Sequence, residues 1–216
     1  REVGDDMIEV LVEAVNKKLT TVETLRSELG IIGTAEDALL SKLIDQASAM
    51  IETYCNRCFA KQKYRETIPG YGNVYLALSV RPVVSVESVK EEGRVITDYS
   101  LDSPSSGLLY RRTGWGWNPG IAWNITWHIM ANSELVNYEV EYTAGYGLPG
   151  EPDRTLPADI ERACLEIAKT WYLENQQGTN IQSESLGDYS VTYAKPADRT
   201  LPQTVLLTLD RWRVFI

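Results

Sequence analysis

The chain has 216 residues, 44% of them hydrophobic and 24% charged, a composition typical of globular rather than disordered proteins. Its 21 Lys and Arg residues against 30 Asp and Glu residues give a net charge of −9, which argues against a general nucleic-acid-binding protein. It has no apolar run of about 18 residues and no apolar stretch near its start, so we expect neither a membrane span nor a signal peptide. Three Cys residues do not suffice for a disulfide framework, and we expect reduced thiols.

The first 60 residues have the apolar spacing of helices, with apolar residues three and four apart. Residues 19–60 are predicted to hold a short helix that Gly30 ends and a longer helix, about 20 residues, from Thr34 to Asn56. Residues 1–18 are predicted to form an extra N-terminal helix, whose apolar positions continue to Leu19: Ile8, Leu11, Val12, Val15 and Leu19.

After Phe59 the apolar period changes from 3.6 to two, which predicts half-buried antiparallel strands. Turns containing Gly, Pro, Asp or Ser separate the alternating stretches. The region 61–150 is therefore predicted to be a β-rich insertion. Its alternating stretches are 74–80, 84–86, 122–129 and 138–142.

Helix spacing returns after a loop rich in Gly and Pro, and predicts a helix within residues 155–175. Residues 176–200 are predicted to form a polar loop and a short strand, and residues 201–216 a last helix. The order of elements predicts one α+β domain over residues 1–216. Its expected architecture is a small bundle of about four to five helices, with the antiparallel insertion between the second and third core helices.

Three groups of residues are candidates for chemistry, and none matches a catalytic pattern. Cys55 and Cys58 form a C-x-x-C at a helix C-terminus, where the helix dipole disfavours a thiolate. His128 is the single histidine and has no nucleophile motif beside it. Glu139 and Glu141 share one strand face, which is typical of a solvated surface. We expect no catalytic, cofactor or metal site, and we keep a thiol enzyme as an open alternative.

The aromatic residues are the stronger functional signal. Four of the six Trp residues lie between Trp115 and Trp127. Trp115 and Trp117 lie in a Gly- and Pro-rich turn, where we expect exposed side chains rather than core ones. Exposed Trp is common at protein interfaces and also stacks on sugars. A protein interface, local packing and a ligand site all remain open for this turn.

Five stretches of the chain, taken in order, carry a family resemblance. They lie at 19–31, 37–59, 78–101, 140–163 and 186–202, and include the motifs Arg81-Pro82-Val83, Tyr99-Ser100-Leu101, Val140-Glu141-Tyr142, Leu156-Pro157 and Leu201-Pro202. In this order they resemble the head–tail connector, or adaptor and head-completion, proteins of long-tailed double-stranded DNA bacteriophages. Residues 1–18 lie outside the resemblance.

The resemblance implies a non-enzymatic structural protein of the virion neck, at the head–tail interface, made in the host cytoplasm. It implies a ring, usually of twelve copies, that binds the portal protein and carries the next connector or tail-completion protein. Double-stranded DNA would pass through the lumen without specific binding, and the net acidity suits such passage. Trp115 and Trp117 are candidates for the ring or tail interface. The C-terminal segment is the candidate for portal docking: Val205, Leu206, Leu209, Arg211, Trp212, Arg213 and Phe215.

One alternative function keeps the same aromatic residues. In it the β-rich region is a binding module for a glycan or protein ligand, without catalysis or cofactor. Saturable quenching of Trp fluorescence by oligosaccharides would favour that module over the adaptor. Neither function involves a membrane.

Overall fold

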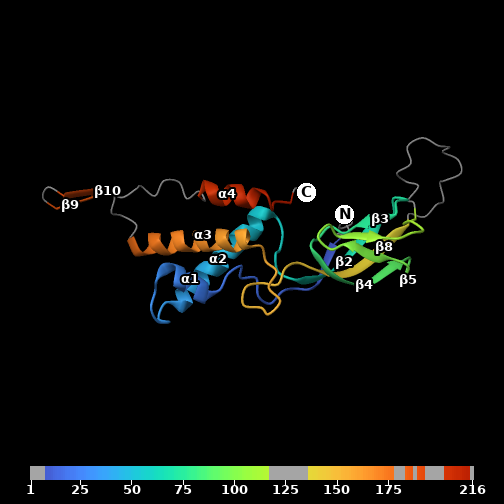
Figure 1. Cartoon of the computed structure of the whole chain (residues 1–216), viewed down its shortest axis with the longest axis horizontal. Coiled ribbons are helices and arrows are strands. Elements are labelled where there is room, and N and C mark those ends of the chain that lie inside the picture. The colour runs from blue at the N-terminus through green and yellow to red at the C-terminus, as the bar shows by residue number, and fades with distance from the viewer. Residues whose placement is uncertain (1–7, 117–135, 178–182, 187–188, 193–201, 215–216) are drawn as a thin grey trace, which may run out of the picture. The chain divides into compact units, whose positions relative to one another are not determined.

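The computed structural model describes residues 8–116, 136–177, 183–186, 189–192 and 202–214. The chain divides into two compact units. We call residues 1–15 with 60–146 the β unit, and residues 16–59 with 147–216 the helical unit. Figure 1 shows the strands of the first and the helices of the second.

The β unit contains two antiparallel sheets. The five-stranded sheet has, in spatial order, β1 (Ile8–Val12), β2 (Gln62–Pro69), β8 (Asn137–Ala144), β4 (Val83–Glu91) and β5 (Arg94–Ile96). The three-stranded sheet has, in spatial order, β3 (Tyr75–Ala77), β7 (Leu108–Tyr110) and β6 (Ser100–Ser103). The outermost strands of the larger sheet are short, which limits the length of its exposed edges.

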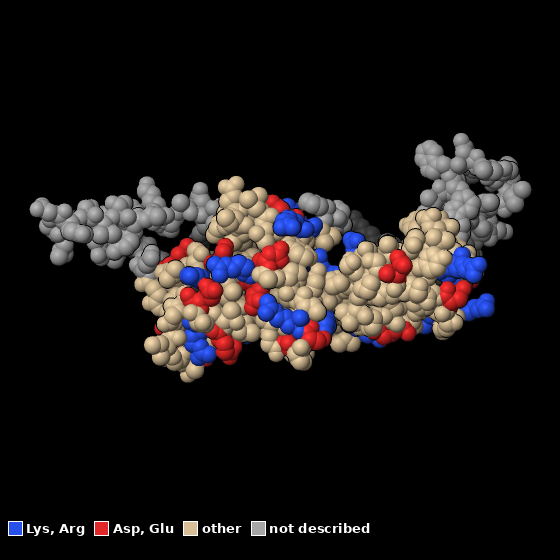
Figure 2. Space-filling view, in the orientation of Figure 1, with Lys and Arg blue, Asp and Glu red and all other residues tan. Residues whose placement is uncertain are grey.

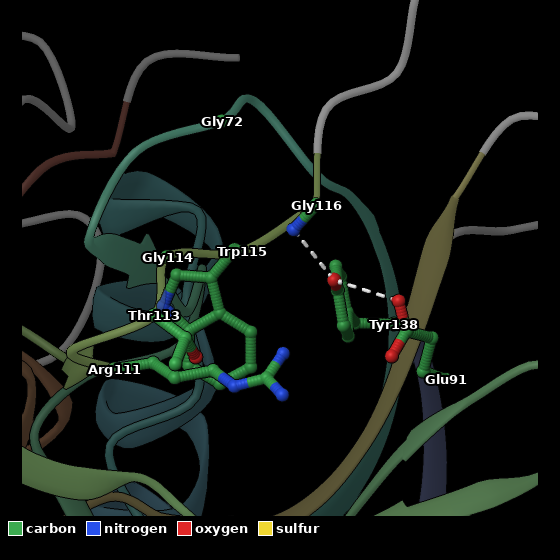
Figure 3. A pocket seen from close by; sticks show the side chains of 8 residues that line it. All are labelled: Gly72, Glu91, Arg111, Thr113, Gly114, Trp115, Gly116 and Tyr138. Atoms are coloured by element: carbon green, nitrogen blue, oxygen red, sulfur yellow. Dashed lines mark hydrogen bonds between the residues drawn. The ribbon is translucent and has the colours of Figure 1, made fainter.

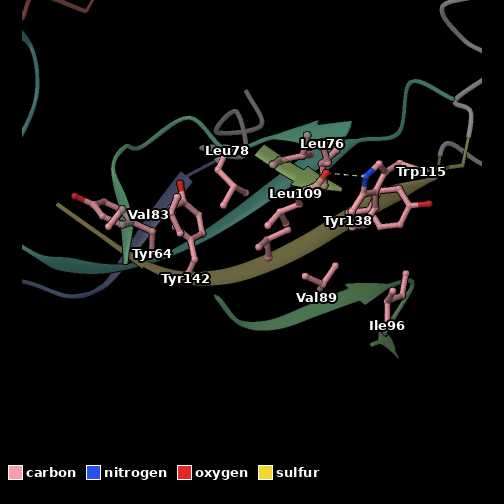
Figure 4. Packing of buried hydrophobic residues seen from close by; sticks show 13 residues of the cluster. Tyr64, Leu76, Leu78, Val83, Val89, Ile96, Leu109, Trp115, Tyr138 and Tyr142 are labelled. Atoms are coloured by element: carbon pink, nitrogen blue, oxygen red, sulfur yellow. Dashed lines mark hydrogen bonds between the residues drawn. The ribbon is translucent and has the colours of Figure 1, made fainter. Parts of the chain in front are cut away.

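The core of the β unit is rich in aromatic side chains (Figure 4). Along β8 every second residue is buried, including Tyr138, Val140 and Tyr142, because successive side chains point to opposite faces of a sheet. The ring of Tyr142 lies 5.7 Å from that of Tyr64 on the neighbouring strand. Leu76 and Leu109 come from the smaller sheet, so the two sheets share one core.

A buried carboxylate, that of Glu66, links the five-stranded sheet to the loop that follows β3. Glu66 on β2 is only 4% exposed. Its carboxylate accepts hydrogen bonds from the hydroxyl of Tyr142 (2.7 Å), from the backbone N–H of Ser79 (3.1 Å) and from the Ser79 hydroxyl. Three donors replace the water that burial removes, which offsets much of the desolvation cost.

The helical unit contains the four helices of the described chain and a small hairpin. Its elements are α1 (Val22–Leu29), α2 (Asp37–Cys55), α3 (Ala158–Gln177), the hairpin of β9 (Ser183–Leu186) and β10 (Tyr189–Thr192), and α4 (Gln203–Asp210). Thr21 caps α1, because its hydroxyl accepts the Thr24 N–H, and Gly30 ends it with a φ of 67°. Helix α3 packs on both α2 and α4.

The predicted α+β class, with antiparallel strands between helices, is confirmed. The predicted N-terminal helix is wrong over the residues that the structure describes, because Ile8–Val12 is a strand. Its β-branched residues fit a strand as well as its spacing fits a helix, and pairing with β2 decides between them. Strand β2 was not predicted, since the buried side chains of Gln62 and Glu66 hide its alternation.

Candidate interaction surfaces

The C-terminal segment, residues 202–214, is the first candidate surface, and part of it is built into the helical unit. Val205 and Leu209 are 2% and 0% exposed, so they are core residues of their own subunit. They lie four residues apart, on the face of α4 that packs against α2 and α3. Leu206 is half-buried on the same helix.

Polar contacts fix the end of this segment. The indole N–H of Trp212 donates to the Asp159 carboxylate in the first turn of α3 (2.9 Å). The Tyr54 hydroxyl donates to Asp210 (2.6 Å), and this hydrogen bond raises the pKa of Tyr54. The backbone N–H of Val214 donates to the last carbonyl of α2, that of Cys55, at 2.9 Å, satisfying a group that a helix end leaves open. The segment thus contacts the ends of two helices.

The opposite side of the segment faces solvent. Leu207 is 62% and Val214 40% exposed. Arg211 and Arg213 are exposed, and the Arg213 guanidinium lies 5.4 Å from the centre of the Tyr54 ring. The predicted docking set therefore divides into side chains buried within the subunit, such as Val205 and Leu209, and exposed side chains, such as Arg211. Phe215 lies outside the described residues.

Trp115 is the second candidate, and the expectation that it is exposed is wrong. It is 1% exposed, and its indole N–H donates to the Leu109 carbonyl (3.2 Å). Its ring packs edge-on against Tyr138, with 5.1 Å between ring centres. Burial removes Trp115 from a surface that could stack on a sugar. Trp117 lies outside the described residues, and its interface role stays a prediction.

A shallow pocket of about 420 Å³ opens beside Trp115 (Figure 3). On one side the Arg111 guanidinium lies 5.7 Å from the centre of the Trp115 ring. On the other side the Tyr138 hydroxyl accepts a hydrogen bond from the Gly116 N–H (2.7 Å) and donates one to Glu91 (3.1 Å). The polar groups of this wall bond to each other, so the pocket offers a ligand few unsatisfied partners.

The thiols do not have the properties of a catalytic pair. Cys55 is fully buried, and burial raises its pKa to about 11. Its thiol donates to the Leu209 carbonyl (3.7 Å). Burial raises the pKa of Cys164 to about 12. Cys55 and Cys164 are both buried, and protonated buried thiols are poor nucleophiles, whereas Cys58 is partly exposed.

The carboxylates of β8 belong to a solvated, charge-paired face, as predicted. Glu141 lies 2.9 Å from Arg65 and 3.3 Å from Lys63, and these partners lower its pKa. Glu139 lies 2.8 Å from Lys90. Figure 2 likewise shows basic and acidic side chains interspersed on the visible face. His128 lies outside the described residues.

Among the described residues, no group of three or more His, Cys, Asp or Glu side chains is placed to hold a metal ion. Of the described helices, none combines the length and apolar character needed to cross a bilayer.

Comparison with known proteins gives a family and a fold. The profile of a protein family described as head completion protein matches residues 18–215. No curated protein matches the chain. A chain of the structure "Neck of empty GTA particle computed with C6 symmetry" is 18% identical, with a TM-score of 0.55, and the match covers 97% of this chain and 96% of that one. A chain of "Virion of native gene transfer agent (GTA) particle" is 19% identical, with a TM-score of 0.54 and the same coverage. At these identities the likeness concerns the fold.

Proposed function

The chain belongs to the head completion protein family, and on that premise we propose that it is a structural protein of the virion neck, where it joins the head to the tail. The observation that carries this proposal is the family match over residues 18–215, which includes both units apart from β1. The similarity of its fold to a chain of a neck structure supports the same role. The raised pKa values of the buried thiols of Cys55 and Cys164 argue against catalysis by these thiols.

The finer part of the proposal is a ring of identical copies that docks on the portal protein. A ring requires a heterologous interface that closes on itself. Twelve copies are compatible with sixfold symmetry, which is how the similar neck structure is described. A net charge of −9 supports passage of DNA through the lumen without adhesion, since like charges repel. The tail-side partner is the next connector or tail-completion protein.

The C-terminal segment contributes to portal docking through its exposed side. Val205, Leu209 and Trp212 anchor α4 within the subunit, so they position the segment. Leu207 and Arg211 face outward from the same helix end and supply one apolar and one cationic contact. This division explains how one short helix can serve both the fold and a partner.

Removal of the protein from the producing strain tests the function. DNA-filled heads without tails should accumulate, and expression of the chain in trans should restore joined particles. Mass spectrometry of purified restored particles should find the polypeptide. If tails still join heads without the protein, or if purified particles lack it, the proposed function is wrong.

A further inference from the structure

Few polar groups of the pocket beside Trp115 lack a partner, and those few lie on Arg111. This residue directly follows β7, and its Nε donates to both carboxylate oxygens of Asp98, at 3.0 and 3.1 Å. Among the described residues, no hydrogen bond joins either terminal nitrogen of its guanidinium to another residue. Figure 3 shows these two nitrogens pointing into the space in front of Tyr138 and Glu91.

Contacts on several sides hold the guanidinium in this position. The backbone N–H of Arg111 donates to the Val74 carbonyl (2.9 Å), which fixes the main chain. The Thr113 hydroxyl donates to Asp98 (3.3 Å), so the carboxylate that holds Arg111 is itself held. The guanidinium also lies 5.7 Å from the centre of the Trp115 ring, and only 17% of the Arg111 side chain is exposed. A donor pair fixed in advance loses little conformational entropy when a ligand binds.

Another arginine of this chain shows what such a guanidinium can hold. Arg65 donates through one terminal nitrogen to Glu9 (3.1 Å) and through the other to Glu141 (2.9 Å). One guanidinium therefore accommodates two carboxylates in this protein. Arg111 holds a single carboxylate, through Nε, and its two terminal nitrogens remain as a fork. The spacing of such a fork matches the two oxygens of a carboxylate.

Glycines keep the space in front of this fork open. Gly72, Gly114 and Gly116 all line the pocket, whose volume of about 420 Å³ lies within the range of about 300–1,000 Å³ found for ligand sites. A Cβ atom on Gly116 would lie 3.0 Å from the Tyr138 hydroxyl oxygen and 3.6 Å from a Glu91 carboxylate oxygen. The missing side chain therefore leaves room for part of a ligand.

The charges around the pocket favour a ligand with one negative charge over a polyanion. Glu91 lines the pocket across from the fork, and its carboxylate accepts the Tyr138 hydroxyl (3.1 Å). Glu91 and Asp98 together outweigh the charge of Arg111, and the whole chain carries a net charge of −9. A run of phosphates would be repelled by this surface. A single carboxylate can bond to the fork while the rest of its molecule lies away from Glu91.

We propose that this pocket binds an acidic side chain of a protein partner, with the carboxylate accepting one hydrogen bond from each terminal nitrogen of Arg111. Such charge-assisted, two-point contacts are strong and depend on geometry, so they suit recognition of one residue. The proposal goes beyond the neck role, because it assigns a binding site to the β unit irrespective of how copies of the chain assemble.

Titration of the purified full-length chain with a short peptide tests the site. The probe is a capped tripeptide with a central glutamate, and the matched neutral probe carries glutamine in its place. In isotope-labelled protein, the nuclear magnetic resonance signals of the Arg111 side chain and the Trp115 indole should shift and saturate with the glutamate peptide only. No saturable shift, or equal shifts with both peptides, would overturn the proposal. A short DNA duplex should leave both signals unchanged, and tighter binding of the duplex at Arg111 would assign the pocket to phosphate instead.

Two adjacent arginines provide a matched pair of variants. Arg111→Lys keeps the positive charge but removes the fork, so it should weaken binding of the glutamate peptide at least about fivefold. Arg112 is exposed and does not line the pocket, and Arg112→Lys should leave the affinity unchanged. Equal losses in the two variants would mean that general cationic attraction holds the peptide, and the proposal would be wrong.

Two adjacent glutamates provide a second pair, in which the expected change is a gain. Glu91→Gln removes the like charge across the pocket and keeps an oxygen that accepts the Tyr138 hydroxyl, so it should strengthen peptide binding about three- to tenfold. Glu92→Gln changes the net charge equally but lies outside the pocket lining, and should leave the affinity unchanged. Unfolding cannot produce a gain in affinity, so this pair decides the matter even where Arg111→Lys does not fold. Equal affinities of the Glu91 and Glu92 variants would contradict the site.

One acidic residue of the same chain is tested as a competitor. Glu134 is the single acidic residue in the sequence between Gly116 and Val136. Glu134→Gln should leave peptide binding unchanged, whereas stronger binding would show that the chain's own side chain occupies the fork, and the proposal of a partner would be wrong. The titration uses the isolated chain, so its failure leaves the neck role standing. Absence of the chain from purified particles would refute the neck role and would not alter the measured affinity.

Discussion

The helical unit and the β unit form their cores from different side chains. The helical core is mainly aliphatic, with Leu25, Leu40, Ile44, Ile51 and Ile160 fully buried. The core of the β unit is built around Trp and Tyr rings, and their polar ends are bonded inside the unit. A regular apolar pattern is sufficient for the first kind of core, whereas the second depends on particular hydrogen bonds.

The two buried glutamates show the same contrast. Glu161 on α3 pairs with the Arg154 guanidinium and accepts a hydrogen bond from Thr20 (3.2 Å). Among the described residues, Glu66 receives hydrogen bonds only from neutral donors, of Ser79 and Tyr142. The Glu66 carboxylate is therefore buried without a cationic partner among the described residues, and we expect the stability of the β unit to be sensitive to its substitution.

The largest expected effect is at Glu66. Glu66→Ala should lower the free energy of unfolding by about 3–5 kcal/mol, because it opens a cavity at a buried position and leaves the buried Tyr142 hydroxyl without its acceptor. Glu139→Ala, on the exposed face of the same sheet, should cost less than about 1 kcal/mol. Urea unfolding followed by near-ultraviolet circular dichroism, which reports on the aromatic core, measures both. Equal losses for the two variants would refute the role assigned to the Glu66 bonds.

A second prediction concerns the aliphatic core. Leu209→Ala should destabilise the helical unit by about 2–5 kcal/mol, since it removes a fully buried side chain. Leu207→Ala, two residues earlier and 62% exposed, should change stability by less than about 0.5 kcal/mol. Far-ultraviolet circular dichroism in urea compares them.

The same pair of variants tests the two sides of α4. Particle assembly with Leu207→Ala should show reduced joining of heads and tails although the variant is folded. If Leu207→Ala assembles normally while Leu209→Ala is as stable as the parent, the division of α4 into anchor and contact sides is wrong.

The sequence predicts the helical unit better than the β unit. The apolar spacing between Leu39 and Tyr54 predicts α2 to within a few residues, because aliphatic periodicity alone decides that helix. Strand β2 escapes prediction, since Gln62 and Glu66 are polar residues in buried positions, and their partners are distant in sequence. Only tertiary contacts explain why those side chains turn inward.

The candidate surfaces were predicted in part. Composition identifies the C-terminal segment as apolar and cationic. The structure shows that Leu209 is buried whereas Leu207 is exposed. The sequence does not distinguish these two residues, because the packing of α3 against α4 determines which side is buried. The Gly-rich turn predicts an exposed Trp115. In the structure its ring is buried in the core and its indole N–H donates to the Leu109 carbonyl. The resemblance to head–tail connectors, carried by motif order, identified the family correctly.

The third prediction uses pH on the helical unit. The folded-state pKa of Cys55 is raised to about 11, so the folded protein holds this proton more tightly than the unfolded chain does. The stabilisation of the folded state by this protonated thiol is fully present below the ordinary thiol pKa, near 9. It is lost as the pH rises toward the folded-state pKa of about 11. The urea midpoint should fall between pH 9 and pH 10.5, and Cys55→Ser should fall less steeply. Parallel slopes for the two proteins would contradict burial as the cause.

The smallest expected effect is at a helix end. Thr21→Ala should destabilise the helical unit by about 1 kcal/mol, because it removes the hydroxyl that accepts the Thr24 N–H (3.2 Å) at the start of α1. Thr53→Ala provides the control, since that hydroxyl donates to a carbonyl already used within α2, and Ala is the better helix former. Thermal unfolding should therefore separate the two variants, with Thr53→Ala at or above the midpoint of the parent. If both lower the midpoint equally, the cap contributes nothing specific, and packing alone sets the stability of α1.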